Sequence, residues 1–316
     1  MKRCGIVGLP NVGKSSLFNF LTQSNKAKSE NYPFCTIEPN ESVVFFEDYR
    51  VTDLKNFSSS KKEVFSPIMI TDIAGLVEGA SSGEGLGNKF LSHIREVDVI
   101  MHVVRCFDDK DVSHVTESGH PVQDLEVIFT ELRIADKETI ENMRKKTKDK
   151  QVLEDLNYAE KCIDEEISFS STLPLLCAKP FFVLGNGEDL QLIEDLKKYT
   201  TSRNIKFINF DVKKVSDPAF AKYSKENIAN LCSEIFQLLK IIFFFTTGKE
   251  ESRAWAIKEG INAKEAAAEI HTDISNRFIK ATVFNINEIK TKYRVRNEGK
   301  DYIVKDGDII VFQHNA

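Results

Sequence analysis

Short apolar runs alternate with segments of helical periodicity over the first third of the chain. After the first run, Leu17, Phe20 and Leu21 recur at the spacing of one helical face. Such an alternation of strands and helices is typical of a doubly wound, mostly parallel α/β sheet, because helices then cover both sheet faces. The runs that predict buried strands span residues 3–7, 42–46, 67–71 and 98–105.

The pattern changes to two long amphipathic helices between residues 124 and about 170. We expect these helices to run antiparallel and to pack their apolar stripes together. The basic segment 143–150, MRKKTKDK, lies between them and is either a contact site for RNA phosphates or a solvated turn. The stripes consist of Leu125, Ile128, Phe129, Leu132 and Ala135 in the first helix and Leu153, Leu156, Ala159, Ile163 and Ile167 in the second.

The strand pattern returns after the helical pair, at residues 179–186 and 206–210. A helix then begins near residue 229 and leads into the apolar run 241–245, which we expect to pack the α/β domain against the C-terminal domain. From residue 246 onward, a small β-grasp pattern is predicted. Its expected elements are a strand at 253–257, a helix at 262–271, a strand at 278–284 and a hairpin turning at 306–308. The predicted domains are therefore an α/β domain in two parts, 1–123 and 173–245, a helical insertion, 124–172, and a β-grasp domain, 246–316.

The segment from Gly8 to Ser16, GLPNVGKSS, fits the phosphate-binding P-loop GxxxxGK[ST] and lies between the first strand and the first helix. Glycines permit the tight turn that directs backbone N–H groups at a phosphate, and the helix N-terminus adds partial positive charge. Lys14 is expected to reach the β- and γ-phosphates, and the Ser15 hydroxyl to bind Mg²⁺. The nucleotide-binding residues predicted here are Asn11, Val12, Gly13, Lys14, Ser15 and Ser16.

A second part of the Mg²⁺ site is predicted where the strand 67–71 ends in the DxxG motif Asp72 to Gly75. Asp72 is expected to hold the metal through water, and the Gly75 N–H to sense the γ-phosphate. In the polar loop 31–41, Thr36 is the candidate that closes on Mg²⁺, with a packing or capping role as its alternative. The predicted catalytic residues are Lys14, Thr36, Asp72 and Gly75, and the predicted metal-binding residues are Ser15, Thr36 and Asp72.

The residue after the DxxG motif predicts slow intrinsic hydrolysis. Many regulatory GTPases have a glutamine there, which orients the attacking water. Here the position is occupied by Leu76, whose side chain can neither donate nor accept a hydrogen bond.

Four strings of this sequence resemble the Obg-like ATPase (YchF) family of P-loop proteins: GLPNVGKSS, NYPFCTIEPN, DIAGLVEGASSGEGLGNKFL and IREVDVIMHVVRCF. Near the C-terminus, FFTTGKEESRAWAIKEG and KDYIVKDGDIIVF resemble the TGS domain of that family. The resemblance implies a P-loop NTPase with an inserted antiparallel helical arm and a C-terminal β-grasp, TGS-like domain. It further implies hydrolysis of ATP in preference to GTP, and association with the ribosome or ribosomal RNA through the arm and the TGS-like domain.

The strand 179–186 ends in a candidate base-reading segment that departs from the family pattern. GTPases use NKxD, in which the carboxylate accepts hydrogen bonds from guanine, whereas the family resembled here has NxxE. The acid three residues after Asn186 is Asp189, as in GTPases, but Gly187 replaces the lysine that covers the base. Alternatively, the loop is one residue shorter and Glu188 occupies the place of the family's acid. We predict Asn186, Gly187 and Asp189 as base-contacting residues and favour ATP, with GTP left open.

Composition narrows the class of protein without changing this interpretation. A chain of 316 residues with 41% hydrophobic content can fold as two or three domains, and a net charge of −5 argues against a protein that coats nucleic acid. Six widely separated cysteines without a CxxC pair predict reduced thiols and no structural metal. The apolar runs are too short to span a bilayer, so we expect a cytoplasmic, monomeric protein that does not bind membranes.

Three functions are compatible with these motifs. The first is a Mg²⁺-dependent ATPase acting as a slow switch whose nucleotide state controls docking to the ribosome, with a GTP-preferring GTPase of the same fold as its close alternative. The second is a nucleotide-dependent protein scaffold in which hydrolysis is incidental. The third is a small-molecule kinase, which the DxxG motif disfavours.

Overall fold

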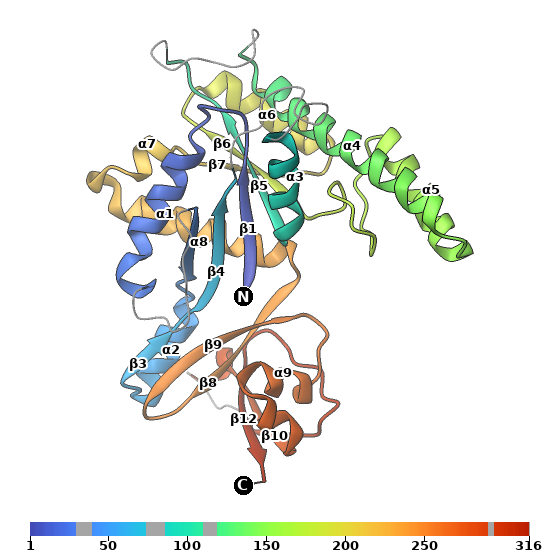
Figure 1. The fold of residues 1–316 in the computed structure, drawn as a ribbon. Coiled ribbons are helices and arrows are strands. Elements are labelled where there is room, and N and C mark those ends of the chain that lie inside the picture. The colour runs from blue at the N-terminus through green and yellow to red at the C-terminus, as the bar shows by residue number, and fades with distance from the viewer. Residues whose placement is uncertain (30–39, 74–85, 110–118, 290–293, 316) are drawn as a thin grey trace. The chain divides into compact units, whose positions relative to one another are not determined.

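The computed structural model describes residues 1–29, 40–73, 86–109, 119–289 and 294–315. The described chain forms two units, one made of residues 1–44 and 69–227 and the other of residues 45–68 and 228–316. The chain therefore crosses from one unit to the other three times. Figure 1 shows the path of the chain and the helices and strands named below.

The first sheet has the strand order β2-β4-β1-β5-β6-β7. β1 pairs in parallel with β5, β5 with β6, and β6 with β7. All seven positions of β5 are buried, because helices cover both faces of the sheet at its centre. The predicted α/β fold with a largely parallel sheet is confirmed. Its strands are β1 (Lys2–Val7), β2 (Glu41–Phe46), β4 (Ser66–Asp72), β5 (Val99–Arg105), β6 (Phe181–Asn186) and β7 (Lys206–Asn209).

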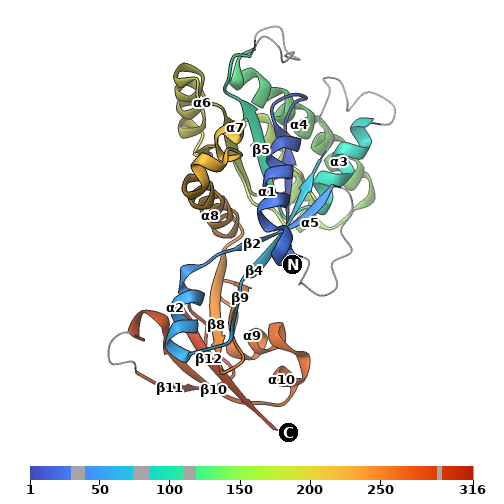
Figure 2. The same ribbon diagram turned by 90° about the vertical axis from the view of Figure 1, so that its left-hand side faces the viewer.

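Helices lie on both sides of this sheet in the first unit. Figures 1 and 2 show α1 and α7 on one side and α3 and α4 on the other. Val104 and Val183 of the sheet pack against Leu125 of α4 and Leu196 of α6, and all four side chains are fully buried. The helices are α1 (Lys14–Ser29), α3 (Leu86–Glu96), α4 (Pro121–Lys146), α6 (Leu190–Ser202) and α7 (Val212–Val215).

The two helices expected between residues 124 and 170 are α4 and α5 (Lys150–Asp164). Ile140 of α4 packs against Leu156 of α5, so the two helices pair through the later turns of α4. The expectation that the two predicted stripes pack together is wrong for Leu125 and Phe129, which pack against the sheet instead. α4 is longer than expected, because its first turns cover the sheet and its last turns pair with α5. Asp136 of α4 is fully buried and accepts hydrogen bonds from the backbone N–H groups of Leu176 (2.8 Å) and Cys177 (2.7 Å). This carboxylate ties the chain that returns to β6 onto α4.

The second unit contains a sheet in the order β11-β10-β12-β8-β9-β3. Phe244 of β8, Val283 of β10 and Ile310 of β12 share one buried cluster with Ala266 of α9. The strands are β3 (Lys62–Val64), β8 (Ile241–Thr247), β9 (Glu251–Lys258), β10 (Phe278–Asn285), β11 (Arg296–Glu298) and β12 (Asp308–His314). The helices are α2 (Tyr49–Ser58), α9 (Ala263–Ile270) and α10 (Thr272–Asn276), with a short 3₁₀ turn at Ile286–Glu288. α8 (Ala221–Leu238) begins in the first unit, after a 3₁₀ turn at Pro218–Phe220, and continues into the second.

Three features of the second unit differ from the sequence-based expectation. The apolar run 241–245 is part of the strand β8, which pairs with β9 and β12, so the boundary expected at residue 246 falls inside this strand. Residues 49–64 contribute α2 and β3, which the apolar pattern did not predict. β12 pairs with β10 and β8, so the turn at 306–308 is not the tip of the expected hairpin.

Within the described residues, no helix is both long and apolar enough to cross a membrane.

Candidate functional site

The P-loop joins β1 to α1, and Asn186 at the end of β6 holds it in place. The Asn186 side-chain N–H donates to the Val12 carbonyl (2.8 Å), and its oxygen accepts from the Val212 N–H (3.0 Å). Gly13 has a φ of +100°, and a Cβ added there would overlap the Asn186 amide. The P-loop glycine is therefore required both by backbone conformation and by the close approach of Asn186.

Lys14 begins α1, and its side chain turns back over the P-loop. It is 7% exposed, and its ammonium donates to the Leu9 carbonyl (2.8 Å). Burial lowers the pKa of Lys14 to about 8, and the charge of Asp72 offsets part of that shift. A buried cation whose hydrogen-bond partner among the described residues is a loop carbonyl is suited to binding an anion such as a phosphate.

Ser15 and Asp72 meet beside Lys14. The Ser15 hydroxyl donates to Asp72 Oδ2 (3.0 Å), which joins the first turn of α1 to the end of β4. Burial raises the pKa of Asp72, whereas the Ser15 hydroxyl and the Lys14 charge lower it. Asp72 Oδ1 is buried and has no hydrogen-bond partner among the described residues. Mg²⁺ prefers oxygen ligands and commonly keeps waters, so one hydroxyl beside a carboxylate with an unpartnered oxygen fits this ion.

A cavity of about 900 Å³ extends from the P-loop to the ends of β5 and β6. Five of the six nucleotide-binding residues predicted in the P-loop line this cavity: Asn11, Gly13, Lys14, Ser15 and Ser16. Val12 is 1% exposed and contributes its carbonyl to Asn186 instead of lining the cavity. The far end is lined by residues that the sequence analysis did not select: Phe107, Asp108, Asp109, Asp211, Val212, Lys213 and Ser216.

The carboxylates of Glu188 and Asp189 have different surroundings at this far end. Asp189 is the N-cap of α6, and its Oδ1 accepts from the N–H groups of Gln191 (3.0 Å) and Leu192 (3.1 Å). Glu188 lines the cavity with an exposed side chain. A Cβ at Gly187 would overlap the Cys106 carbonyl, so the backbone here leaves no room for a covering lysine. The loop between β6 and α6 is thus so short that Asp189 already caps the helix. This favours the alternative in which the Glu188 carboxylate is the one available to a base.

The loop after β7 also belongs to this site, although the sequence pattern assigned no residue to it. Asp211 caps α7 by accepting from the Lys214 N–H (3.1 Å), and the next residue donates its N–H to Asn186. The signal in the sequence was weak, because an aspartate before a four-residue helix is a common cap without a specific function. The predicted roles of Thr36 and Gly75 stay predictions, because both residues lie outside the described part of the chain.

Two protein families match parts of the chain. A family described as a 50S ribosome-binding GTPase matches residues 3–156. A family described as a protein of unknown function (DUF933), which forms the C-terminal part of YchF GTPases, matches residues 241–315.

Several relatives match nearly the whole chain. The ribosome-binding ATPase YchF of Buchnera aphidicola is 38% identical over 360 residues, covering 99% of both chains. The ribosome-binding ATPase YchF of Bacillus subtilis is 36% identical, also covering 99% of both chains. Obg-like ATPase 1 of Oryza sativa subsp. japonica is 38% identical over 99% of this chain and 92% of its own length.

Solved structures agree with these relatives. The YchF GTPase of Schizosaccharomyces pombe superimposes with a TM-score of 0.81 at 30% identity, covering 99% of this chain and 97% of that protein. A GTP-binding protein from Pyrococcus horikoshii has a TM-score of 0.62 at 18% identity over the full length of both chains, which shows a shared fold alone. The resemblance found in the sequence is therefore confirmed: this chain belongs to the YchF family of Obg-like ATPases, and it is a P-loop nucleotide hydrolase.

Proposed function

We propose that this protein is a Mg²⁺-dependent ATP hydrolase that acts as a slow nucleotide switch. The observation that carries the proposal is the meeting of Lys14, Ser15 and Asp72 beside a P-loop held by Asn186. A family member with this arrangement has the groups that grip the phosphates of a nucleotide and a metal ion.

In this proposal, each residue has a separate part in binding and hydrolysis. Bound Mg²⁺ would neutralise charge on the β- and γ-phosphates, held by the Ser15 hydroxyl directly and by Asp72 through water. Lys14 would leave the Leu9 carbonyl and donate to the phosphates, whose charge restores the ordinary basicity of the ammonium. Asn186 keeps the loop in the binding conformation before the nucleotide arrives, which lowers the cost of ordering it.

Measurement of phosphate release without any acceptor substrate tests the hydrolase directly. Lys14→Ala and Asp72→Ala are each expected to reduce Mg²⁺-dependent turnover at least about a hundredfold, since each removes a group that contacts the transferred phosphate or its metal. Full turnover in either variant would contradict the proposed site. Turnover that requires a phosphoryl acceptor would instead indicate a kinase.

We further propose that Glu188, in preference to Asp189, reads the base. One carboxylate oxygen of Asp189 accepts hydrogen bonds from the first turn of α6. The exposed Glu188 carboxylate lines the cavity and can accept a hydrogen bond from the amino group of adenine. The bacterial and rice relatives are named ATPases and the yeast protein a GTPase, so the base has to be identified by binding.

The affinities for ATP and GTP in the presence of Mg²⁺ distinguish the two acids. Glu188→Ala is expected to change the ratio of the two affinities by about tenfold, because a hydrogen bond from the base to a carboxylate is lost. Asp189→Ser is the matched control, because serine also caps a helix but carries no charge. If the ratio of the ATP and GTP affinities changes in Asp189→Ser but not in Glu188→Ala, then Asp189 is the residue that contacts the base.

We also propose that the tip between α4 and α5 contacts ribosomal RNA. Its lysines are exposed, and the Buchnera and Bacillus relatives are named ribosome-binding ATPases. Lysines that neutralise phosphates give binding that weakens as salt increases. Replacement of Lys145, Lys146 and Lys148 by glutamate is expected to reduce the fraction of protein that sediments with ribosomes. The remaining binding should depend less steeply on salt concentration. An unchanged fraction would show that the tip does not contact the ribosome.

A further inference from the structure

The far end of the nucleotide cavity contains a cation to which the proposed hydrolysis gives no role. This cation is Lys213, the second residue of the short helix α7. Its side chain is exposed, and among the described residues it has no ion pair and donates no hydrogen bond. Lys14 and Lys213 are the two cations among the described residues that line the cavity. Lys14 lies in the P-loop, whereas Lys213 lies at the end that Glu188 lines.

The backbone positions of Lys213 and Glu188 are both fixed through Asn186. Glu188 follows Asn186 by two residues, directly after β6. On the other side, the Asn186 side-chain oxygen accepts a hydrogen bond from the N–H of Val212 (3.0 Å), the residue before Lys213. The two oppositely charged side chains at the far end of the cavity therefore start from backbone segments that one buried amide holds together.

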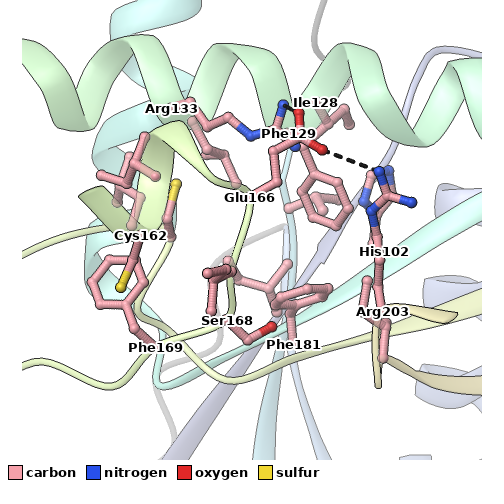
Figure 3. A pocket seen from close by; sticks show the side chains of 18 of the residues that line it. His102, Ile128, Phe129, Arg133, Cys162, Glu166, Ser168, Phe169, Phe181 and Arg203 are labelled. Carbon is pink, nitrogen blue, oxygen red and sulfur yellow. Dashed lines mark hydrogen bonds and ion pairs between the residues drawn. The ribbon is translucent and has the colours of Figure 1, made fainter. Parts of the chain in front are cut away.

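The helix α6, which begins just after Glu188 and its cap Asp189, is also fixed at its C-terminal end. Arg203, the C-cap of α6, pairs with Glu166 (3.0 Å), and Glu166 also pairs with Arg133 of α4 (2.9 Å). Figure 3 shows these ion pairs of Glu166. Because α6 is held at both ends, the backbone position of Glu188 is set before a base arrives.

Lys213 brings to this end of the cavity a group that the segment after β6 does not contain. Gly187 has a φ of +137°, and a Cβ there would overlap the Cys106 carbonyl, so the segment has no side chain at this position. A cationic contact with the base therefore has to come from another segment, and the loop after β7 supplies Lys213. The neighbouring Lys214 does not line the cavity, since its ammonium lies over the Phe220 ring, 5.3 Å from the centroid.

The two purine bases differ in what they present to a cation. Guanine has two adjacent hydrogen-bond acceptors, O6 and N7, whereas in adenine the acceptor N7 lies beside the 6-amino donor. An ammonium group therefore binds this edge of guanine more strongly than the same edge of adenine. A carboxylate can bind either base, because it accepts from the 6-amino group of adenine or from the N1–H and 2-amino groups of guanine.

We propose that Lys213 donates hydrogen bonds to O6 and N7 of guanine and thereby makes GTP a second substrate of this site. The inference rests on the proposed function, because it places the base at the end of the cavity that Glu188 lines. With ATP, Glu188 supplies the charged contact to the base. With GTP, Glu188 accepts and Lys213 donates, so the site distinguishes the two nucleotides less sharply than Glu188 alone would.

Dissociation constants for ATP, GTP and inosine triphosphate (ITP), measured by titration calorimetry of the full chain with Mg²⁺, test the proposal. ITP keeps O6, N7 and N1–H but lacks the 2-amino group, so it separates a contact to Lys213 from a contact between that amino group and Glu188. Lys213→Met is expected to weaken the binding of GTP and of ITP about tenfold, while the affinity for ATP changes less than about threefold. Lys214→Met is the matched control, because it removes the same charge from the neighbouring exposed position, and it is expected to leave all three affinities unchanged.

The other outcomes separate this inference from the proposed function. An equal loss of affinity for all three nucleotides in Lys213→Met would overturn the inference, since the lysine would then act on the phosphates that they share. Unchanged affinities in Lys213→Met, or a parent protein that binds ATP but not GTP, would also overturn it and would leave the proposed ATP hydrolase standing. A parent protein that binds none of the three nucleotides would contradict the proposed function, and this inference with it.

Discussion

At the scale of single residues, Asn186 shows how one side chain organises a site. Its amide joins the P-loop, through Val12, to the start of α7, through Val212, and it is 5% exposed. The sequence placed Asn186 correctly at the end of a strand but described it as a base-contacting residue. The structure shows it bonded to backbone on both sides, an arrangement that depends on the loop after β7 and could not be read from local sequence.

Replacement of Asn186 by alanine is expected to weaken ATP binding about tenfold to a hundredfold, because two buried backbone groups lose their partner and the P-loop is released. Titration calorimetry with ATP and Mg²⁺ measures the effect. Asn186→Asp keeps the acceptor for the Val212 N–H but sets a buried carboxylate oxygen against the Val12 carbonyl, so a loss at least as large as that of the alanine variant is expected. Equal affinity in all three proteins would mean that the P-loop holds its conformation unaided.

His102 gives the first unit a predictable pH dependence. Burial, with a smaller contribution from the Lys14 charge, lowers the pKa of His102 from 6.5 to about 3. Between these values the unfolded chain binds the proton and the folded chain does not, so the free energy of unfolding falls as the pH decreases from 6.5. This histidine is expected to remove about 2 kcal/mol between pH 7 and pH 5.

Urea denaturation of the parent and of His102→Leu at these two pH values checks this expectation, because other titrating groups contribute equally to both proteins. The variant is expected to lose less stability than the parent on acidification. An equal loss would mean that His102 takes up a proton in the folded state.

At the scale of elements, the strands of the first sheet and the helix pair could be predicted because local periodicity determines them. The run 241–245 could not, since five apolar residues after a helix fit either a packed helix end or a strand. Its identity as β8 depends on β9 and β12, and the β12 partner lies more than sixty residues further along the chain. The same reason explains why α2 and β3 were missed: β3 has three residues and pairs with β9.

Asp136 is expected to hold the return segment onto α4 more strongly than any surface ion pair does. Asp136→Asn places an amide N–H against one of the two backbone donors, at Leu176 and Cys177, and should reduce the free energy of unfolding by about 2–4 kcal/mol. The neighbouring Lys137 pairs with Asp164 in solvent (2.5 Å), so Lys137→Ala should cost less than about 1 kcal/mol. Chemical denaturation measures the free energy of unfolding of both variants. Similar losses of stability in the two variants would contradict this expectation.

At the scale of the whole molecule, the second unit is assembled from two distant stretches of sequence, 45–68 and 228–316. Within it, Arg50 of α2 pairs with Asp306 (2.5 Å), and the Ser60 hydroxyl bonds to the Gly248 carbonyl (2.6 Å). The pattern of strands, helix and turn predicted a C-terminal domain beginning at residue 246, but such a domain omits most of β8, which lies inside the sheet.

A fragment of residues 246–316 is therefore expected to remain unfolded. A single chain that joins residues 45–68 through a flexible linker to residues 228–316 is expected to fold, because it contains every strand of the second sheet. Circular dichroism and dispersion of amide NMR signals distinguish the two outcomes. A cooperative thermal transition in the shorter fragment would show that β8 is dispensable.

The divided second unit sets an order of events during protein synthesis. Residues 45–68 leave the ribosome early, yet the strands beside which they fold are made only after residue 240. The nascent chain must keep this segment available while the flanking strands of the first sheet already emerge. Completion of the second unit therefore has to wait for the synthesis of β8 and β9, and a chain stalled before β8 would leave residues 45–68 without the strands that they pack with.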